Sequence, residues 1–207
     1  QACAIHHKDG AMLVLAGPGS GKTAVAGGAC YFAFKNGFQS AMMAPTEILA
    51  SQHYVTLSMF LEPFGAHVCL LTSSVTAKNR REIKEKIKSG YFSVVVGTHA
   101  IIQKDVEFNS LGLVITDEQH RFGVGQRSAL AEKGNFPHKL VMSATPIPRT
   151  LGLIIYGDLD VSVINQLPKG RKPVSTYAVT SRLRERTFSF VRKALNEGRQ
   201  AYVVCPM

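Results

Sequence analysis

The residues best suited to chemistry form a glycine-rich run near the start of the 207-residue chain. The run reads AGPGSGKT over residues 16–23, between a short apolar stretch and a helix-like one. In that context the backbone N–H groups of a P-loop surround phosphate oxygens at a helix N-terminus, whereas an ordinary glycine-rich turn binds nothing. Lys22 is expected to contact the β- and γ-phosphates of a nucleotide, and Thr23 to bind Mg²⁺. The predicted phosphate-binding residues are Gly17, Gly19, Ser20, Gly21, Lys22 and Thr23.

Two adjacent carboxylates, Asp117 and Glu118, follow the apolar run 113–116. If that run is a strand of a parallel sheet, its carboxyl end faces the same crevice as the P-loop. Asp117 is then placed to hold Mg²⁺, and Glu118 to orient or deprotonate an attacking water. Neighbouring acids alone are more often solvated loop charges. Together with the P-loop they predict a nucleoside triphosphatase.

Short apolar runs alternate with helix-like stretches along the chain. Because the runs are continuous, they predict strands covered on both faces, and the alternation predicts a doubly wound, mostly parallel sheet in an αβα sandwich. The predicted strands are Ala11–Ala16, Ser40–Ala44, His67–Leu71, Ser93–Val96, Leu111–Ile115 and Lys139–Met142. The predicted helices are Lys22–Asn36, Thr46–Phe60, Thr76–Lys88, Gln126–Glu132 and Thr150–Tyr156.

A change of composition marks a domain boundary. The stretch NQLPKGRKP over residues 165–173 combines prolines, glycine and cations, which is typical of a linker. We therefore expect a first domain over 1–166, a linker over 167–173 and the truncated first βαβ of a second domain over 174–207. The expected elements of that second domain are a strand (Val174–Val179), a helix (Arg182–Asn196) and a strand (Ala201–Cys205).

The overall charge favours a polyanionic partner. Lys and Arg number 24 against 14 Asp and Glu, giving a formal charge of +10. Such an excess is typical of nucleic-acid binding, although a basic protein with no such role has the same composition. The cysteines (Cys3, Cys30, Cys69 and Cys205) form no C-x-x-C pair, which argues against a zinc site or a disulfide framework and favours the cytoplasm.

Four further motifs carry a family resemblance. They read APTEILASQH over 44–53, GTHAIIQ over 97–103, DEQHRFGV over 117–124 and SATPIPRTL over 143–151. They resemble the RecG branched-DNA helicases of superfamily two. The resemblance implies the first RecA-like motor domain of an ATP-dependent helicase that uses ATP and Mg²⁺. It also implies remodelling of forks and Holliday junctions in recombination and repair, with a second RecA-like domain and an N-terminal wedge domain as partners.

The resemblance also implies residue roles. His120, among the catalytic residues, is expected to hydrogen-bond towards Ser143 or Thr145, and these two with Arg149 form the predicted coupling set. A satisfied loop histidine is the alternative for His120. The basic stretch 78–88 is instead interpreted as a solvated helix face, because Glu82 and Lys86 are spaced i,i+4.

The resemblance further implies three DNA-binding residues: Thr46 and Thr98 are expected to hold one strand by its phosphates, and His99 is expected to lie close to the DNA. Two of them have a structural alternative that explains them without DNA. Thr46 follows a proline at a predicted helix start and equally predicts an N-cap. His99 equally fits a residue packed at the end of a strand.

The first 23 residues resemble a different group, the UvrD/PcrA helicases of superfamily one. Gln1 stands at the spacing of that family's adenine-reading glutamine, and LVLAGPGSGKT matches its P-loop. The chain is then either a divergent RecG relative or a chimeric join.

Three alternatives to a RecG-like function remain open. A transcription-repair coupling translocase has nearly the same motifs but carries Glu at the position of Gln119, so Gln119 favours RecG. A small-molecule P-loop kinase shares the phosphate site, but not the SATPIPRT and GTH segments. A non-catalytic nucleic-acid-binding module does not require Lys22, Asp117 and Glu118 together.

Overall fold

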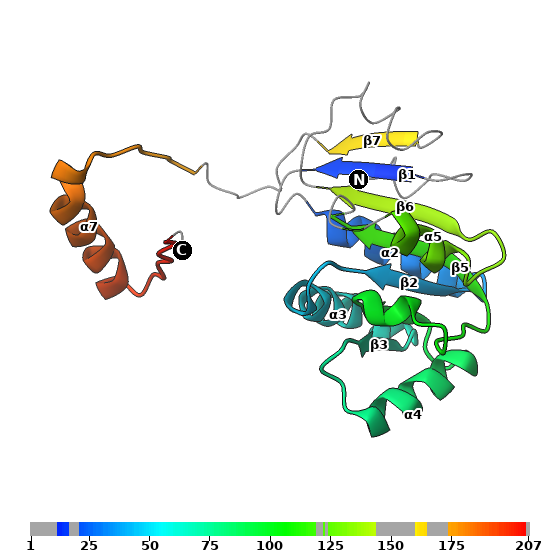
Figure 1. Ribbon diagram of the computed structural model, residues 1–207. Coiled ribbons are helices and arrows are strands. Elements are labelled where there is room, and N and C mark those ends of the chain that lie inside the picture. Colours follow the sequence, from blue (N-terminus) through cyan, green and yellow to red (C-terminus); the bar gives the residue numbers. More distant parts are fainter. Residues whose placement is uncertain are drawn as a thin grey trace. The chain divides into compact units, whose positions relative to one another are not determined.

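The computed structural model describes residues 12–16, 21–118, 122, 124–143, 160–164 and 174–205 (Figure 1). The chain divides into two compact units, Gln1–Lys169 and Gly170–Met207, and each is described by itself. The finer boundaries expected at 166 and 174 stay predictions.

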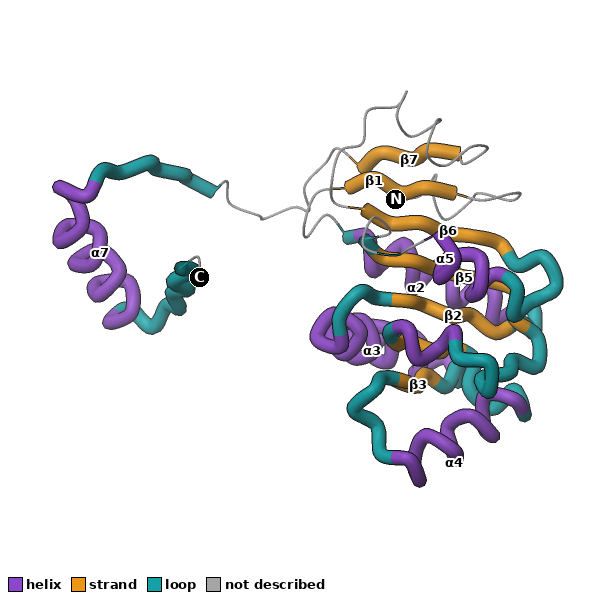
Figure 2. Tube along the Cα trace, in the orientation of Figure 1, coloured by secondary structure: helices purple, strands orange, loops and turns teal. Residues whose placement is uncertain are grey.

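The first unit is built on one sheet of seven described strands, all paired in parallel. Their spatial order is β3-β4-β2-β5-β6-β1-β7, and Figure 2 shows them as a stack of orange segments. The strands are β1 (Met12–Ala16), β2 (Gln39–Met43), β3 (Val68–Leu71), β4 (Val94–Gly97), β5 (Leu111–Asp117), β6 (His138–Ser143) and β7 (Asp160–Ile164).

Helices connect these strands, as parallel pairing requires. They are α2 (Lys22–Lys35), α3 (Glu47–Leu61), α4 (Ala77–Lys88) and α5 (Val124–Ala131), with short 3₁₀ turns η1 (Glu62–Phe64) and η2 (His99–Ile102). The predicted helices agree with α2 to α5 within a few residues, except that Thr150–Tyr156 lies outside the described residues.

Successive residues of the strands enter two separate hydrophobic cores. Met42 and Val96 pack with α2 and α3 on one face of the sheet. Met43 and Val95 pack with α4, α5 and η2 on the other face. The strands are covered on both sides, which is why their sequences are continuously apolar. The αβα sandwich expected from the sequence is confirmed.

The edge strand β7 was absent from the sequence predictions. Its sequence, DVSVI, interrupts the apolar residues with Asp160 and Ser162, and Val163 is exposed. An edge strand has a neighbour on one side only and is less thoroughly covered. The pattern that identifies the central strands is therefore weak here.

The second unit contains one described α-helix, α7 (Arg184–Asn196), preceded by the 3₁₀ turn η4 (Ser181–Leu183). The helix prediction is confirmed, but the strands predicted at 174–179 and 201–205 are wrong. Neither segment pairs with any described strand, and their apolar side chains are exposed, as at Val174 (82%) and Val204 (90%). Without a hydrogen-bonded neighbour, an apolar run has the composition of a strand but not its structure.

Helix α4 has the solvated face expected from its sequence. Lys86 Nζ donates to Glu82 Oε1 at 2.8 Å across one helical turn, and both side chains are exposed. This hydrogen bond and the lysine charge lower the pKa of the Glu82 carboxyl. This i,i+4 pair agrees with the interpretation of the stretch as a solvated helix face.

Candidate nucleotide-binding site

The start of α2 is the helical end of the predicted P-loop. Gly21 is the N-cap and has a φ of 94°, a left-handed conformation that favours glycine. Lys22 and Thr23 form the first helical turn, where backbone N–H groups lack helical partners and the helix dipole favours anions. Of the predicted P-loop residues, Gly17, Gly19 and Ser20 lie outside the described residues, as does Gln1.

Strand β5 brings the two acidic residues to the same end of the sheet. Asp117 is the last residue of β5 and is buried, and Glu118 follows with a φ of 50°. The Glu118 N–H donates to Met142 O at 2.9 Å and to Asp117 Oδ1 at 3.1 Å. Because Met142 belongs to β6, which lies between β5 and β1, this bond fixes the acidic turn against the strand next to the P-loop strand.

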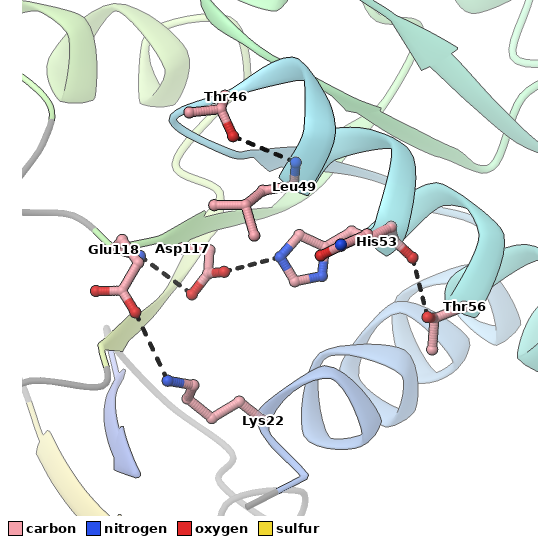
Figure 3. A network of polar contacts seen from close by, with 8 residues as sticks. Lys22, Thr46, Leu49, His53, Thr56, Asp117 and Glu118 are labelled. Atoms are coloured by element: carbon pink, nitrogen blue, oxygen red, sulfur yellow. Dashed lines mark hydrogen bonds and ion pairs between the residues drawn. The ribbon is translucent and has the colours of Figure 1, made fainter. Parts of the chain in front are cut away.

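The P-loop lysine and the second acidic residue meet in space. Lys22 Nζ lies 3.8 Å from Glu118 Oε1, with 12% and 20% of the two side chains exposed (Figure 3). The two motifs are 96 positions apart in the sequence, so the fold alone brings them together. The sequence prediction that both belong to one crevice agrees with this geometry.

A third side chain at the site was missed by sequence reasoning. His53 Nε2 lies 2.8 Å from Asp117 Oδ2, and both residues are buried (Figure 3). His53 shares the buried face of α3 with Ala50, Leu57 and Leu61. A histidine at helical spacing among core residues is the signal that could have drawn attention to it, because a buried imidazole needs a polar partner.

The donor set fits Mg²⁺. Thr23 offers a hydroxyl and Asp117 a carboxylate, the hard oxygen ligands that Mg²⁺ prefers. Among the residues that the structure describes, no group of three or more His, Cys, Asp and Glu could hold a metal by itself. An ion bound at a P-loop takes its other ligands from phosphates and water.

The predicted DNA-contact residues follow the ends of β2 and β4. Thr46 is exposed and caps α3, its hydroxyl accepting from Leu49 N–H at 3.3 Å, so the N-cap alternative is confirmed. Thr98 is buried, and no described residue hydrogen-bonds its hydroxyl. His99 is exposed, so it is not a core residue, and its Nε2 lies 3.4 Å from Ser73 Oγ. A role in DNA binding stays a prediction for all three.

The predicted coupling residues are described only in part. Ser143 ends β6 and is buried beside the P-loop strand, with its backbone in register with Leu15 of β1. His120, Thr145 and Arg149 lie outside the described residues. The coupling set therefore stays a prediction.

Comparison with known proteins gives the family of the chain. A family model described as DEAD/DEAH box helicase matches residues 1–154. The chain therefore belongs to the DEAD/DEAH box helicase family.

Within that family the chain is similar to RecG. It is 53% identical over 189 residues to the ATP-dependent DNA helicase RecG of Bacillus subtilis, covering 91% of this chain and 28% of that protein. Identity to the RecG of Haemophilus influenzae is 51% over 200 residues, or 94% of this chain and 29% of that one. The chain thus spans under a third of these relatives, and the resemblance to RecG-type helicases is confirmed.

Solved structures agree with these sequence matches. A structure of RecG bound to a three-way DNA junction has a TM-score of 0.82 and 42% identity, covering 99% of this chain and 28% of that chain. The Pyrococcus furiosus Hef helicase domain has a TM-score of 0.63 at 19% identity, covering 80% of this chain and 37% of its own, a likeness of fold alone. In the described part of the chain, no helix has the length and apolar character of a membrane span.

Proposed function

We propose that this chain is the ATP-binding motor domain of a RecG-like DNA helicase that remodels branched DNA during recombination and repair. The observation that carries the proposal is the meeting of Lys22 with Glu118, beside the buried Asp117. Three groups lie at the same end of the sheet: the Lys22 ammonium, which would bind phosphate, the Asp117 carboxylate, which would bind the metal, and the Glu118 carboxylate, which would bind the attacking water. The names of the RecG relatives supply the substrate class.

The residues divide the chemistry among themselves. Thr23 and Asp117 would hold Mg²⁺, which when bound neutralises the charge of the β- and γ-phosphates. Lys22 would bind the same phosphates, which then compete with Glu118 for its ammonium group. Glu118, released from that ion pair, would orient the attacking water and accept its proton.

A DNA strand would follow the ends of β2 and β4. Thr98 follows β4 and carries a buried hydroxyl without a described partner. His99, the next residue, is exposed, and so is Thr46, which follows β2. Phosphate contacts from such residues give movement along DNA without sequence readout. The formal charge of +10 supports a polyanionic partner.

The remaining parts of the proposal concern the whole protein. We infer motor domain 1 over 1–166, a linker over 167–173 and the start of motor domain 2 over 174–207. A complete second RecA-like domain would supply transition-state stabilisation, and a wedge domain would recognise the branch. The buried free thiols of Cys30 and Cys69 agree with a reducing cytoplasm.

ATP turnover by this chain, with and without forked DNA, tests the proposal. Because the resemblance places the second motor domain outside this site, we expect slow turnover that DNA barely raises and that an added RecG second motor domain increases. Lys22→Ala and Glu118→Gln should abolish turnover in both conditions. Fast turnover that ignores both DNA and the added domain would contradict a helicase motor and would mean that the ATPase site is complete in itself.

A further inference from the structure

His53 is a buried polar side chain for which the phosphate-site chemistry described above has no role. It lies in the middle of α3, 64 positions before Asp117 in the sequence. Its exposed fraction is 8% and that of Asp117 is 6%. Burial of an imidazole without a hydrogen-bond partner costs free energy, so the hydrogen bond to Asp117 is needed to offset the burial of His53.

The hydrogen bonds around Asp117 fix its carboxylate from two sides. An ionised carboxylate only accepts, so His53 Nε2 is the donor to Oδ2 at 2.8 Å. The other oxygen, Oδ1, accepts from the Glu118 N–H at 3.1 Å. With one donor on each oxygen, rotation of the carboxylate about its terminal bond costs a hydrogen bond. Each oxygen retains a second lone pair for a cation.

Helix α3 holds the imidazole firmly. Its first turn is capped by Thr46, and Leu57 and Leu61 anchor its second half in the core. The same helix contributes His53 to a surface depression of about 590 Å³ that also includes Thr23 of the P-loop. The depression is lined by Thr23, Ser51, Gln52, His53, Val55 and Thr56. His53 therefore lines this depression together with Thr23 and contacts Asp117 through its imidazole, and these are the two residues expected to hold Mg²⁺.

We propose that His53 is a positioning residue that orients the Asp117 carboxylate for Mg²⁺ and links α3 to the metal site. The proposal rests on the function proposed above, since it assigns Asp117 to the metal. Outer hydrogen-bond partners of metal ligands commonly contribute 10- to 100-fold to metal affinity. A purely structural histidine would stabilise the fold without any specific effect on the metal.

Equilibrium binding of a fluorescent ADP to this chain, measured as a function of Mg²⁺ concentration and again in EDTA, separates the two roles. His53→Leu removes the hydrogen-bond donor and keeps a side chain of similar volume. We expect it to raise about tenfold the Mg²⁺ concentration at which the Mg²⁺-dependent gain in ADP affinity is half complete. Affinity in EDTA should change less than twofold. His53→Gln, whose amide can place a donor near the same point, should restore most of the Mg²⁺ dependence. His138→Leu, at an exposed histidine at the start of β6, is the matched control.

The proposal is overturned if folded His53→Leu has the Mg²⁺ dependence of the wild type, or if affinity falls equally in EDTA and in Mg²⁺ without rescue by Gln. Should His53→Leu fail to fold, His53→Asn replaces it, because its shorter amide does not reach Asp117. An equal Mg²⁺ dependence of the Asn and Gln variants would then also overturn it. Absence of nucleotide binding by the wild type would instead contradict the proposed function.

Discussion

Gln39 connects three segments of the first unit through a single buried side chain. Its amide Nε2 donates to Ile87 O at 3.0 Å and to Phe92 O at 2.8 Å. Its Oε1 accepts from the N–H groups of Asn109 and Ser110, at 2.8 and 3.1 Å. All four hydrogen-bonding positions of the amide are used, and the residue is 4% exposed. Replacing it should therefore weaken the start of β2 and the loops before β4 and β5 together.

Gln39→Met keeps the length of the side chain and removes all four bonds. Ile87 O still accepts from Gly90 N–H at 3.0 Å, so three backbone groups lose the partner that the side chain provides. An unsatisfied buried group costs about 1–3 kcal/mol, and because these three are partly buried we take the lower end for each. The free energy of unfolding should fall by about 3 kcal/mol. With an m-value of about 2 kcal/mol/M, the urea midpoint should fall by about 1.5 M.

Urea unfolding followed by far-ultraviolet circular dichroism measures this shift. Gln103→Met is the matched control, because the Gln103 side chain is exposed and a surface substitution of this kind usually changes stability by less than about 0.5 kcal/mol. A midpoint for Gln39→Met equal to that of Gln103→Met would refute the reasoning, since water would then be replacing the buried bonds at no cost.

Two further predictions concern packing and thiol chemistry. Gly97→Ala should destabilise the chain by several kcal/mol or prevent folding, because an added Cβ would overlap Leu71 O on the neighbouring strand. Thermal unfolding should show no such loss for Gly125→Ala, where the Cβ meets nothing within 4 Å; an equal loss would exclude the steric explanation. Burial raises the pKa of the Cys30 thiol to about 12, so iodoacetamide at pH 8 should modify exposed Cys205 and spare Cys30 until urea unfolds the chain. Peptide mass spectrometry reads both sites, and early modification of Cys30 would show that α2 opens readily.

The central elements of the fold were predictable because both faces of the sheet are covered. Continuous apolar runs located β1 to β6, and the glycines of the P-loop located the start of α2. The same reasoning failed where pairing decides the structure. Residues 201–205 are as apolar as a central strand, yet a strand requires a hydrogen-bonded neighbour that local sequence does not reveal.

The site was predictable as far as its motifs extend. Lys22, Asp117 and Glu118 were identified by residue type and spacing, and parallel strand ends brought them to one crevice. His53 was not identified, because its partner is 64 positions away and a helix histidine has many possible surroundings. The bond between them depends on how α3, which packs on β3 and β4, is placed relative to the end of β5, and that is a property of the assembled sheet.

Titration calorimetry of ATP into this chain, in Mg²⁺, tests the central claim most directly, with Lys22→Ala as the comparison. Lys22 is a cation that lies 3.8 Å from Glu118, so its removal takes away a positive charge offered to phosphate. We expect wild-type binding that Lys22→Ala weakens at least tenfold while leaving the circular dichroism spectrum unchanged. Equal affinity of the two proteins, or no binding by a folded wild type, would contradict assignment of this crevice to a nucleotide.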